Sequence, residues 1–137
     1  MVGKGPLEPA VQAQAKELGI AHRLRFAGAR PDVARLMLGA MDVFVMPSLF
    51  EGLGLAAIEA QAAGLPAILS DRIPAEADTL CGLAHFVALE EPAHVWASRI
   101  LQHSDESRIS QADALARIGK SHFNIRKNIE VLCQLYS

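Results

Sequence analysis

The sequence has few aromatic residues, few cysteines and no excess of basic charge. Aromatic side chains make up 5% of the 137 residues, too few for the stacking platforms that bind single-stranded nucleic acids. The formal net charge is -2, so a basic surface that would attract nucleic-acid phosphates is not expected, and we predict no nucleic-acid partner. The two cysteines form neither a disulfide scaffold nor a four-ligand zinc site by themselves, and we expect reduced, buried thiols.

The sequence also lacks recognisable targeting and metal-binding patterns. Residues 1–6 have neither a basic start nor an apolar run, as a signal peptide would. The most apolar stretch, residues 53–69, is broken by polar and turn-forming residues, and a membrane span needs about 20 apolar residues. The five histidines are scattered, so we predict no metal ion. Hydrophobic residues make up 51%, which is typical of a globular domain, and we expect a cytoplasmic one.

Apolar periodicity predicts alternating strands and helices. The continuous apolar run at 42–47 is typical of a strand that is buried on both faces of a parallel sheet. From residue 91 onward the pattern is wholly helical. The predicted fold class is therefore α/β, a Rossmann-like parallel sheet with helices on both faces. Strands are expected at 24–28, 42–47, 65–70 and 84–89, and helices between them at 31–40 and 55–63, with another at 8–18.

Ligands of such sheets bind at the carboxyl ends of strands, and the turn that follows residues 42–47 is the most informative one. Gly52 and Gly54 remove side chains where the backbone would meet a ligand, and the amides at a helix start favour phosphate. A helix that opened at Gly52 would place Glu59 about 10 Å further along the same face. Glu51 and Glu59 would then accept hydrogen bonds from the two hydroxyl-rich ends of a nucleotide sugar. Two solvated surface carboxylates are the alternative interpretation of this spacing.

Three stretches of this region resemble the C-terminal half of the retaining GT-B glycosyltransferases. They are residues 42–48 (DVFVMPS), 51–54 (EGLG) and 59–66 (EAQAAGLP), and they resemble glycosyltransferase family 4 with its Glu-x7-Glu motif. Residues 28–33 (GARPDV) and 68–71 (ILSD) resemble the bacterial enzymes of exopolysaccharide and capsule assembly in that family. The similarity covers about residues 2–89. It implies hexosyltransferase-type transfer from a nucleotide diphosphate sugar to a saccharide or lipid-linked acceptor, without a cofactor.

The resemblance also implies a role for individual residues. Glu51 would contact the donor sugar as the catalytic-site carboxylate, and Glu59 would bind the ribose hydroxyls. The amides of Gly52, Leu53 and Gly54 would contact sugar and phosphate; the family usually has phenylalanine where Leu53 stands. The residues expected near the nucleobase and the phosphates are Gly3, Lys4, Gly28, Ala29 and Arg30.

Compared with the family pattern, the sequence starts one strand–helix unit into the C-terminal domain. That unit supplies an arginine and a lysine that neutralise the leaving diphosphate, and the N-terminal domain would hold the acceptor. We therefore expect an N-terminally truncated, partial nucleotide-sugar-binding domain over 1–137, with the site in 1–90 and only helices in 91–137. The missing half or another chain would cover the exposed sheet edges. The parent protein is predicted to be an enzyme, with peripheral attachment to the inner face of the membrane as an option, whereas the activity of the isolated chain is left open.

Three other functions remain compatible with the sequence. A non-catalytic remnant or binding module would show no turnover with a labelled donor and acceptor. A nucleotide-sugar 2-epimerase of the same fold would epimerise its substrate instead of transferring the sugar. A dinucleotide-binding dehydrogenase is disfavoured, because the sequence has no Gly-x-Gly-x-x-Gly.

Overall fold

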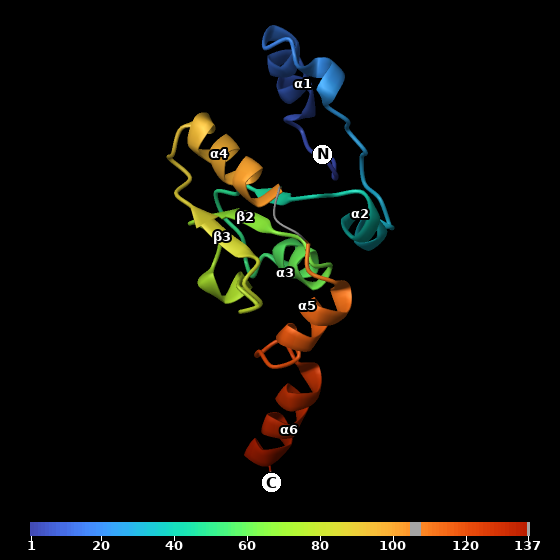
Figure 1. Ribbon diagram of the computed structural model, residues 1–137, viewed down its shortest axis with the longest axis vertical. Helices are drawn as coiled ribbons and strands as arrows, with labels where there is room; N and C mark the ends of the chain where they lie inside the picture. The colour runs from blue at the N-terminus through green and yellow to red at the C-terminus, as the bar shows by residue number, and fades with distance from the viewer. Residues whose placement is uncertain (105–107, 137) are drawn as a thin grey trace. The chain divides into compact units, whose positions relative to one another are not determined.

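The computed structural model describes residues 1–104 and 108–136, which fall into two compact units, Met1–Val33 and Ala34–Ser137. Figure 1 shows the order of their elements along the chain. The smaller unit contains one helix, α1 (Glu8–Glu17), and a single 3-10 turn, η1 (Ala21–Arg23). The helix has a proline in its first turn, where no amide donor is needed.

The prediction of a regular strand at residues 24–28 is wrong, but this segment pairs in part with the backbone of Met1. The Met1 nitrogen donates to the Arg25 carbonyl at 2.6 Å, and the Ala27 amide donates to the Met1 carbonyl at 2.9 Å. These bonds set Met1 beside Phe26 in the pattern of a parallel pair. The pairing then leaves its register, because the next amide, that of Gly3, donates to the carbonyl of Gly28.

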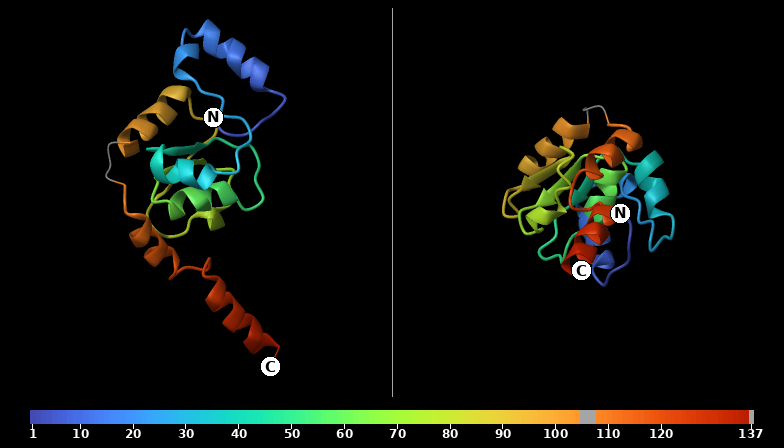
Figure 2. Two further views of the ribbon diagram at one scale, coloured as in Figure 1. Left: turned by 90° about the vertical axis from the view of Figure 1, so that its right-hand side faces the viewer. Right: turned by 90° about the horizontal axis from the view of Figure 1, so that it is seen from below.

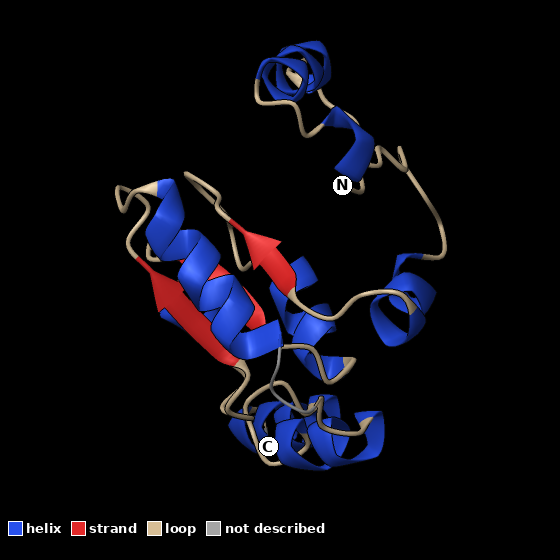
Figure 3. Ribbon diagram, turned by 45° about the horizontal axis from the view of Figure 1, so that its top comes forward, coloured by secondary structure: helices blue, strands red, loops and turns tan. Residues whose placement is uncertain are grey.

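The larger unit is built on a three-stranded parallel sheet in the order β1-β2-β3. The strands are β1 (Phe44–Met46), β2 (Ala67–Ser70) and β3 (Ala84–Val87). Helix α3 (Leu55–Ala62) connects β1 to β2, and the 3-10 turn η2 (Ala75–Ala77) lies between β2 and β3. Figure 3 shows helices on both sides of the strands, so the predicted strand–helix alternation and parallel sheet are confirmed for this unit.

The alternation of side chains along β2 explains how both faces of the sheet are covered. Ala67 and Leu69 pack with Ala57 of α3 in one apolar cluster. Ile68 points to the opposite face, which it shares with its register partner His85. The His85 ring stacks on His103 of α4 (Ala93–Ser104) with 3.6 Å between ring centroids, so α4 covers that second face.

Strand β1 is less buried than its continuous apolar run predicts. Its residues are half-buried or exposed, and Val45 is 38% exposed, whereas every residue of β2 is buried. The difference follows from position, since β2 is central and β1 is an edge strand that pairs with β2 alone among the described strands. The prediction of burial on both faces, made for residues 42–47, is therefore wrong, and it is β2 that is buried on both faces.

Three further helices complete the larger unit: α2 (Val33–Gly39), α5 (Gln111–Ile118) and α6 (Ile125–Leu135). The Arg108 guanidinium joins the carboxyl ends of two helices, donating to the Met37 carbonyl at 2.9 Å and to the Ala63 carbonyl at 3.3 Å. Helix α6 has no buried residue and extends away from the sheet (Figure 2). The helices predicted after residue 91 are confirmed for the described residues, and residues 105–107 lie outside these.

Candidate functional site

A sharp turn joins the carboxyl end of β1 to the start of α3. Its last residue, Gly54, caps the helix in the left-handed conformation, with φ 72° and ψ 46°. A Cβ atom at this position would lie 3.2 Å from Cγ2 of Ile73 and 3.6 Å from Cβ of Ala77. Conformation and space therefore both favour glycine, which sets where α3 begins and where its first amides point.

Helix α3 begins at Leu55, as the predicted range 55–63 has it, so counting helical residues from Gly52 to estimate the position of Glu59 is wrong. Gly52 and Leu53 lie in the exposed part of the loop, and the first helical residue is Leu55. Glu59 is therefore about one helical turn, and not nearly two, beyond the first helical residue. Gly52 and Leu53 do not continue the helix, because the left-handed conformation of Gly54 interrupts the helical path.

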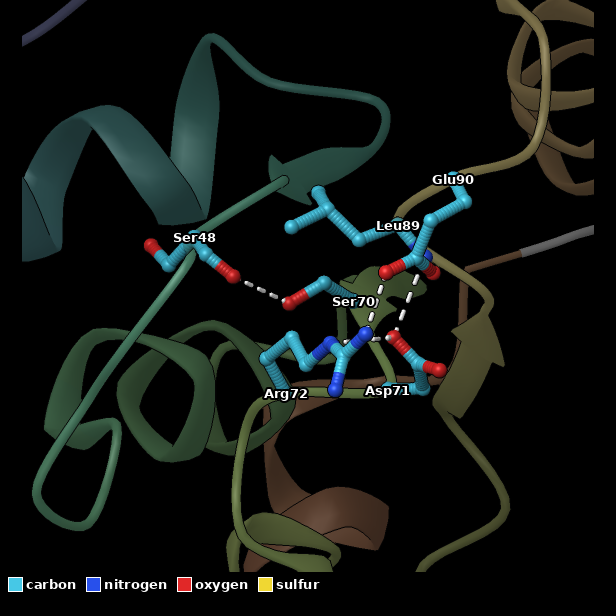
Figure 4. A network of polar contacts seen from close by, with 6 residues as sticks. All are labelled: Ser48, Ser70, Asp71, Arg72, Leu89 and Glu90. Atoms are coloured by element: carbon cyan, nitrogen blue, oxygen red, sulfur yellow. Dashed lines mark hydrogen bonds and ion pairs between the residues drawn. The ribbon is translucent and has the colours of Figure 1, made fainter.

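Glu51 lies on the loop and is held by a serine three residues before it. Ser48 Oγ donates to Glu51 Oε1 at 2.9 Å, and both side chains are half-buried. The Ser48 carbonyl in turn accepts a 2.6 Å hydrogen bond from Ser70 Oγ (Figure 4). Ser70 ends β2 and is fully buried, so the loop is tied to the central strand. Sequence reasoning gave neither serine a role, although a polar residue just after or at a strand end was a usable signal.

Glu59 is exposed and lines a groove between helices. Apart from Glu59, most of the side chains around this groove are small or aliphatic. The other lining residues are Ala34, Leu38, Ala62, Ala63 and Gln111. A carboxylate at such an edge is available to accept hydrogen bonds from a hydroxyl-bearing ligand.

The opposite side of α3 is fixed by a buried amide. Gln61 Nε2 donates to the Ala77 carbonyl at 2.7 Å and to the Ala57 carbonyl at 3.0 Å. Gln61 Oε1 accepts from the amide of Thr79 at 3.1 Å and from its hydroxyl at 2.8 Å. The two residues after Glu59 turn the helix by about 200°, so Glu59 faces outward while Gln61 anchors the helix. This anchoring role was missed in the sequence, where Gln61 is only one letter of the motif.

The predicted residues of the smaller unit are partly brought together. Gly3 and Gly28 share a 2.8 Å backbone hydrogen bond, and the Cβ position of Gly28 lies 3.3 Å from Cε of Lys4. Ala29 follows in the same exposed loop. Arg30, expected near the nucleobase or phosphates, is held by both carboxylate oxygens of Asp32 at 2.7 and 2.8 Å.

The Arg30–Asp32 pair is exposed, and each partner shifts the pKa of the other. The hydrogen bonds from Arg30 lower the pKa of Asp32, and those same bonds raise the pKa of Arg30. Both groups are therefore charged at neutral pH, with the guanidinium partly neutralised by its neighbour.

A second charged network joins the carboxyl ends of β2 and β3. Asp71 Oδ1 accepts from the amide of Leu89 at 3.0 Å, and Arg72 forms ion pairs with Asp71, at 3.7 Å, and with Glu90 (Figure 4). The hydrogen bond from Arg72 lowers the pKa of Glu90. The network links the segments that follow β2 and β3. These lie at the carboxyl ends of the strands, where ligands of this fold class bind.

The described residues contain neither a cluster of metal-binding side chains nor a helix suited to cross a membrane. No group of three or more histidine, cysteine, aspartate or glutamate side chains in them is placed to hold a metal ion. None of their helices combines the length and the apolar character that crossing a bilayer requires. Of the two cysteines, Cys81 is buried as expected, whereas Cys133 is exposed.

Comparison with known proteins gives concordant matches. The family model described as "Glycosyl transferases group 1" matches residues 1–122. EpsF of Bacillus subtilis (strain 168), which is named as a glycosyltransferase of unstated substrate, is 34% identical over 140 residues, covering 100% of this chain. The Escherichia coli UDP-Gal:alpha-D-GlcNAc-diphosphoundecaprenol alpha-1,3-galactosyltransferase is 47% identical over 55 residues, which cover 40% of this chain and 14% of the relative.

A solved structure supports the fold assignment. The lipopolysaccharide outer core galactosyltransferase WaaB, in its apo form, matches 94% of this chain and 38% of its own with a TM-score of 0.73 and 20% identity. The predicted α/β class, a Rossmann-like sheet of the C-terminal GT-B half, is thereby confirmed. The chain spans 35% of EpsF, about a third of that relative.

Proposed function

We propose that this chain, which belongs to the glycosyl transferases group 1 family, binds the donor of a retaining glycosyltransferase. The reaction would move a hexose from a nucleotide diphosphate sugar to a saccharide or a lipid-linked acceptor in polysaccharide biosynthesis. The observation that carries the proposal is the turn between β1 and α3, where Gly54 exposes a helix start beside the anchored carboxylate of Glu51.

In this proposal the donor lies along the start of α3. Glu51 orients the sugar, and the loop amides of Gly52, Leu53 and Gly54 contact sugar and phosphate. Glu59, at the edge of its groove, accepts hydrogen bonds from the ribose. Charge-assisted hydrogen bonds to hydroxyl groups are the strong kind, which suits two carboxylates to this task.

Catalysis would depend on positioning and on charge. Transfer breaks the bond between the sugar C1 and the diphosphate and forms a bond from C1 to an acceptor hydroxyl oxygen, whose proton passes to the departing diphosphate. Negative charge then grows on the diphosphate, where the amides and the positive end of α3 stabilise it. No side chain of this chain is assigned as a general base.

The smaller unit is proposed to border the nucleobase and the phosphates. Gly3, Lys4 and Gly28 already lie together, and Lys4 supplies a positive charge for the phosphates. Arg30 is proposed for the same vicinity, and it would have to exchange one of its hydrogen bonds with Asp32 for the ligand. Residues 1–90 would thus carry the donor site of a partial domain that the helices of 91–137 complete.

The names of two relatives support a proposal for the acceptor. One relative is named for transfer to a diphosphoundecaprenol-linked sugar, and WaaB is named for the lipopolysaccharide outer core. We propose a comparable acceptor and a cytoplasmic site of action at the inner face of the membrane. A further partner, either the remaining two-thirds found in relatives or another chain, would supply acceptor contacts and cover the edge of β1.

Donor binding is the direct test. The chain should bind UDP-galactose or another nucleotide sugar from a panel in a calorimetric titration. Glu51→Ala should weaken binding of the nucleotide sugar by about 1–3 kcal/mol, because charged hydrogen bonds to the sugar are lost. Glu130→Ala, which removes an exposed carboxylate from α6, is the matched control and should bind as the wild type does. A wild-type chain that binds no nucleotide sugar, or an unchanged Glu51→Ala, would contradict the proposal.

A further inference from the structure

The orientation of the Glu51 side chain depends on a neighbouring residue and not on the loop backbone. Residues 47–54 contain neither helix nor strand, so no helical or sheet hydrogen bonds hold the Glu51 backbone. A glutamate side chain on such a loop populates several rotamers unless a partner selects one. In this protein the partner is Ser48, whose hydroxyl donates to Oε1 at 2.9 Å.

The serine is itself fixed by the sheet. Ser70 Oγ donates to the Ser48 carbonyl at 2.6 Å (Figure 4). Ser70 is fully buried at the end of the central strand, where it is in register with Val87 of β3. Its single hydroxyl proton is used in this bond, and its position is set by the most buried strand of the sheet.

The two serines therefore have separable tasks. Ser70 holds the backbone at the start of the loop, whereas the Ser48 side chain donates to Glu51. The Ser48 bond occupies one carboxylate oxygen, and a carboxylate accepts hydrogen bonds at both oxygens. The other oxygen is left to accept from a hydroxyl group of the ligand.

We propose that Ser48 is a positioning residue that holds Glu51 toward the donor sugar, with Ser70 as its anchor in the sheet. The inference rests on the proposed function, because Glu51 must contact the sugar for its orientation to matter. Positioning of this kind acts on the sugar contact alone and leaves the phosphate contacts of the loop amides intact.

The test compares a nucleotide sugar with the nucleotide that lacks the sugar. UDP-galactose and UDP, with GDP-mannose and GDP as a second pair, are titrated into the full chain and its variants. Ser48→Ala should weaken binding of the nucleotide sugar about fivefold to tenfold and leave nucleotide binding unchanged. Ser48→Thr keeps a hydroxyl and should restore most of the loss. Ser98→Ala removes an exposed serine hydroxyl from α4 and serves as the matched control.

The binding results separate a failure of the positioning role from a failure of the proposed function. Equal weakening of both ligands by Ser48→Ala would mean that the loop itself has shifted and would overturn the positioning role. Unchanged binding of both ligands would overturn it as well. A wild-type chain that binds neither member of either pair would instead overturn the proposed function and the inference with it. Ser70→Ala, which loosens the loop backbone, should weaken both ligands and thus differ from Ser48→Ala.

Discussion

At the scale of single residues, two glycines shape the ends of α3. Gly54 begins the helix in the left-handed region, and Gly64 follows its end with φ 79°. Gly64 is also crowded, because a Cβ atom there would lie 2.2 Å from the Ile109 carbonyl oxygen. The helix that carries Glu59 is therefore bounded on both sides by positions where other residues are strained.

Replacing Gly64 tests this boundary. Gly64→Ala should lower the free energy of unfolding by about 2–4 kcal/mol, because backbone strain and a steric clash with Ile109 add together. Gly82 has a similar φ of 81° with nothing within 4 Å of its Cβ position, so Gly82→Ala reports the strain alone and should cost about 1 kcal/mol. Urea denaturation of both variants measures the difference, and equal losses would show that the clash is relieved.

The proposed contact with the ribose also depends on a single residue, Glu59. Glu59→Ala should weaken binding of a free nucleotide such as UDP by about 1–3 kcal/mol, because the ribose is present with or without the sugar. Ser48→Ala spares that same ligand, so the two variants separate the two ends of the donor. Calorimetry with the free nucleotide checks this, and an unchanged affinity would refute the role of Glu59.

At the scale of elements, α3 is attached to the segment after β2 through Gln61. The buried side chain uses both its amide hydrogens and its oxygen, so it satisfies the Ala77 carbonyl and the Thr79 amide at once. A buried network of this kind fixes the rotation of the helix and with it the outward direction of Glu59.

The network predicts a large effect of an apolar replacement. Gln61→Leu keeps the volume but leaves the Ala77 carbonyl and the Thr79 amide buried without partners, which should cost about 2–4 kcal/mol of folding stability. Gln12→Leu, on the exposed side of α1, should change stability little. Guanidinium denaturation measures both, and a Gln61→Leu protein as stable as the wild type would show that water replaces the lost bonds.

The elements differ in how far the sequence predicts them. Helices were found where apolar spacing and a stop signal agree, as in α1 and its end near Gly19. The segment 24–28 alternates as a strand does, but its pairing with Met1 is short and loses register at Gly3. The start of α3 at Leu55 agrees with the predicted range, whereas the lack of space for a Cβ atom at Gly54 depends on Ile73, which is distant in sequence. For the same reason the Ser48–Ser70 bond, which spans 22 positions, was beyond any local pattern.

At the scale of the whole molecule, burial is unevenly divided between the two units. The unit Met1–Val33 has one buried residue, Ala15, whereas the larger unit contains the remaining described core. Amide hydrogens of Ile68 and Leu69 should therefore exchange at least about 100-fold more slowly than those of α1. Hydrogen exchange followed by NMR measures this, and similar rates would show that the units open together.

The exposed ion pairs make the folding stability of the protein weakly dependent on pH. Arg30 and Arg72 lower the pKa of Asp32 and Glu90, respectively, so the folded chain binds fewer protons than the unfolded chain near pH 4. This contribution to stability is present above the unfolded pKa values and is lost as the pH falls through the lowered ones. The denaturation midpoint should fall slightly from pH 6 to pH 3, and Arg72→Ala should reduce that fall; an identical pH profile in the variant would refute the contribution of its pair. High salt should have the same effect as the variant, because both pairs are exposed.

The Arg108 guanidinium has a consequence for the order in which the protein is made. It bonds to the Met37 carbonyl 71 residues earlier in the chain and to the Ala63 carbonyl 45 residues earlier. During synthesis the carboxyl ends of α2 and α3 must therefore wait, without this partner, until Arg108 has left the ribosome. A nascent chain arrested before that point would hold a sheet and two helices whose ends are still open to chaperones and proteases.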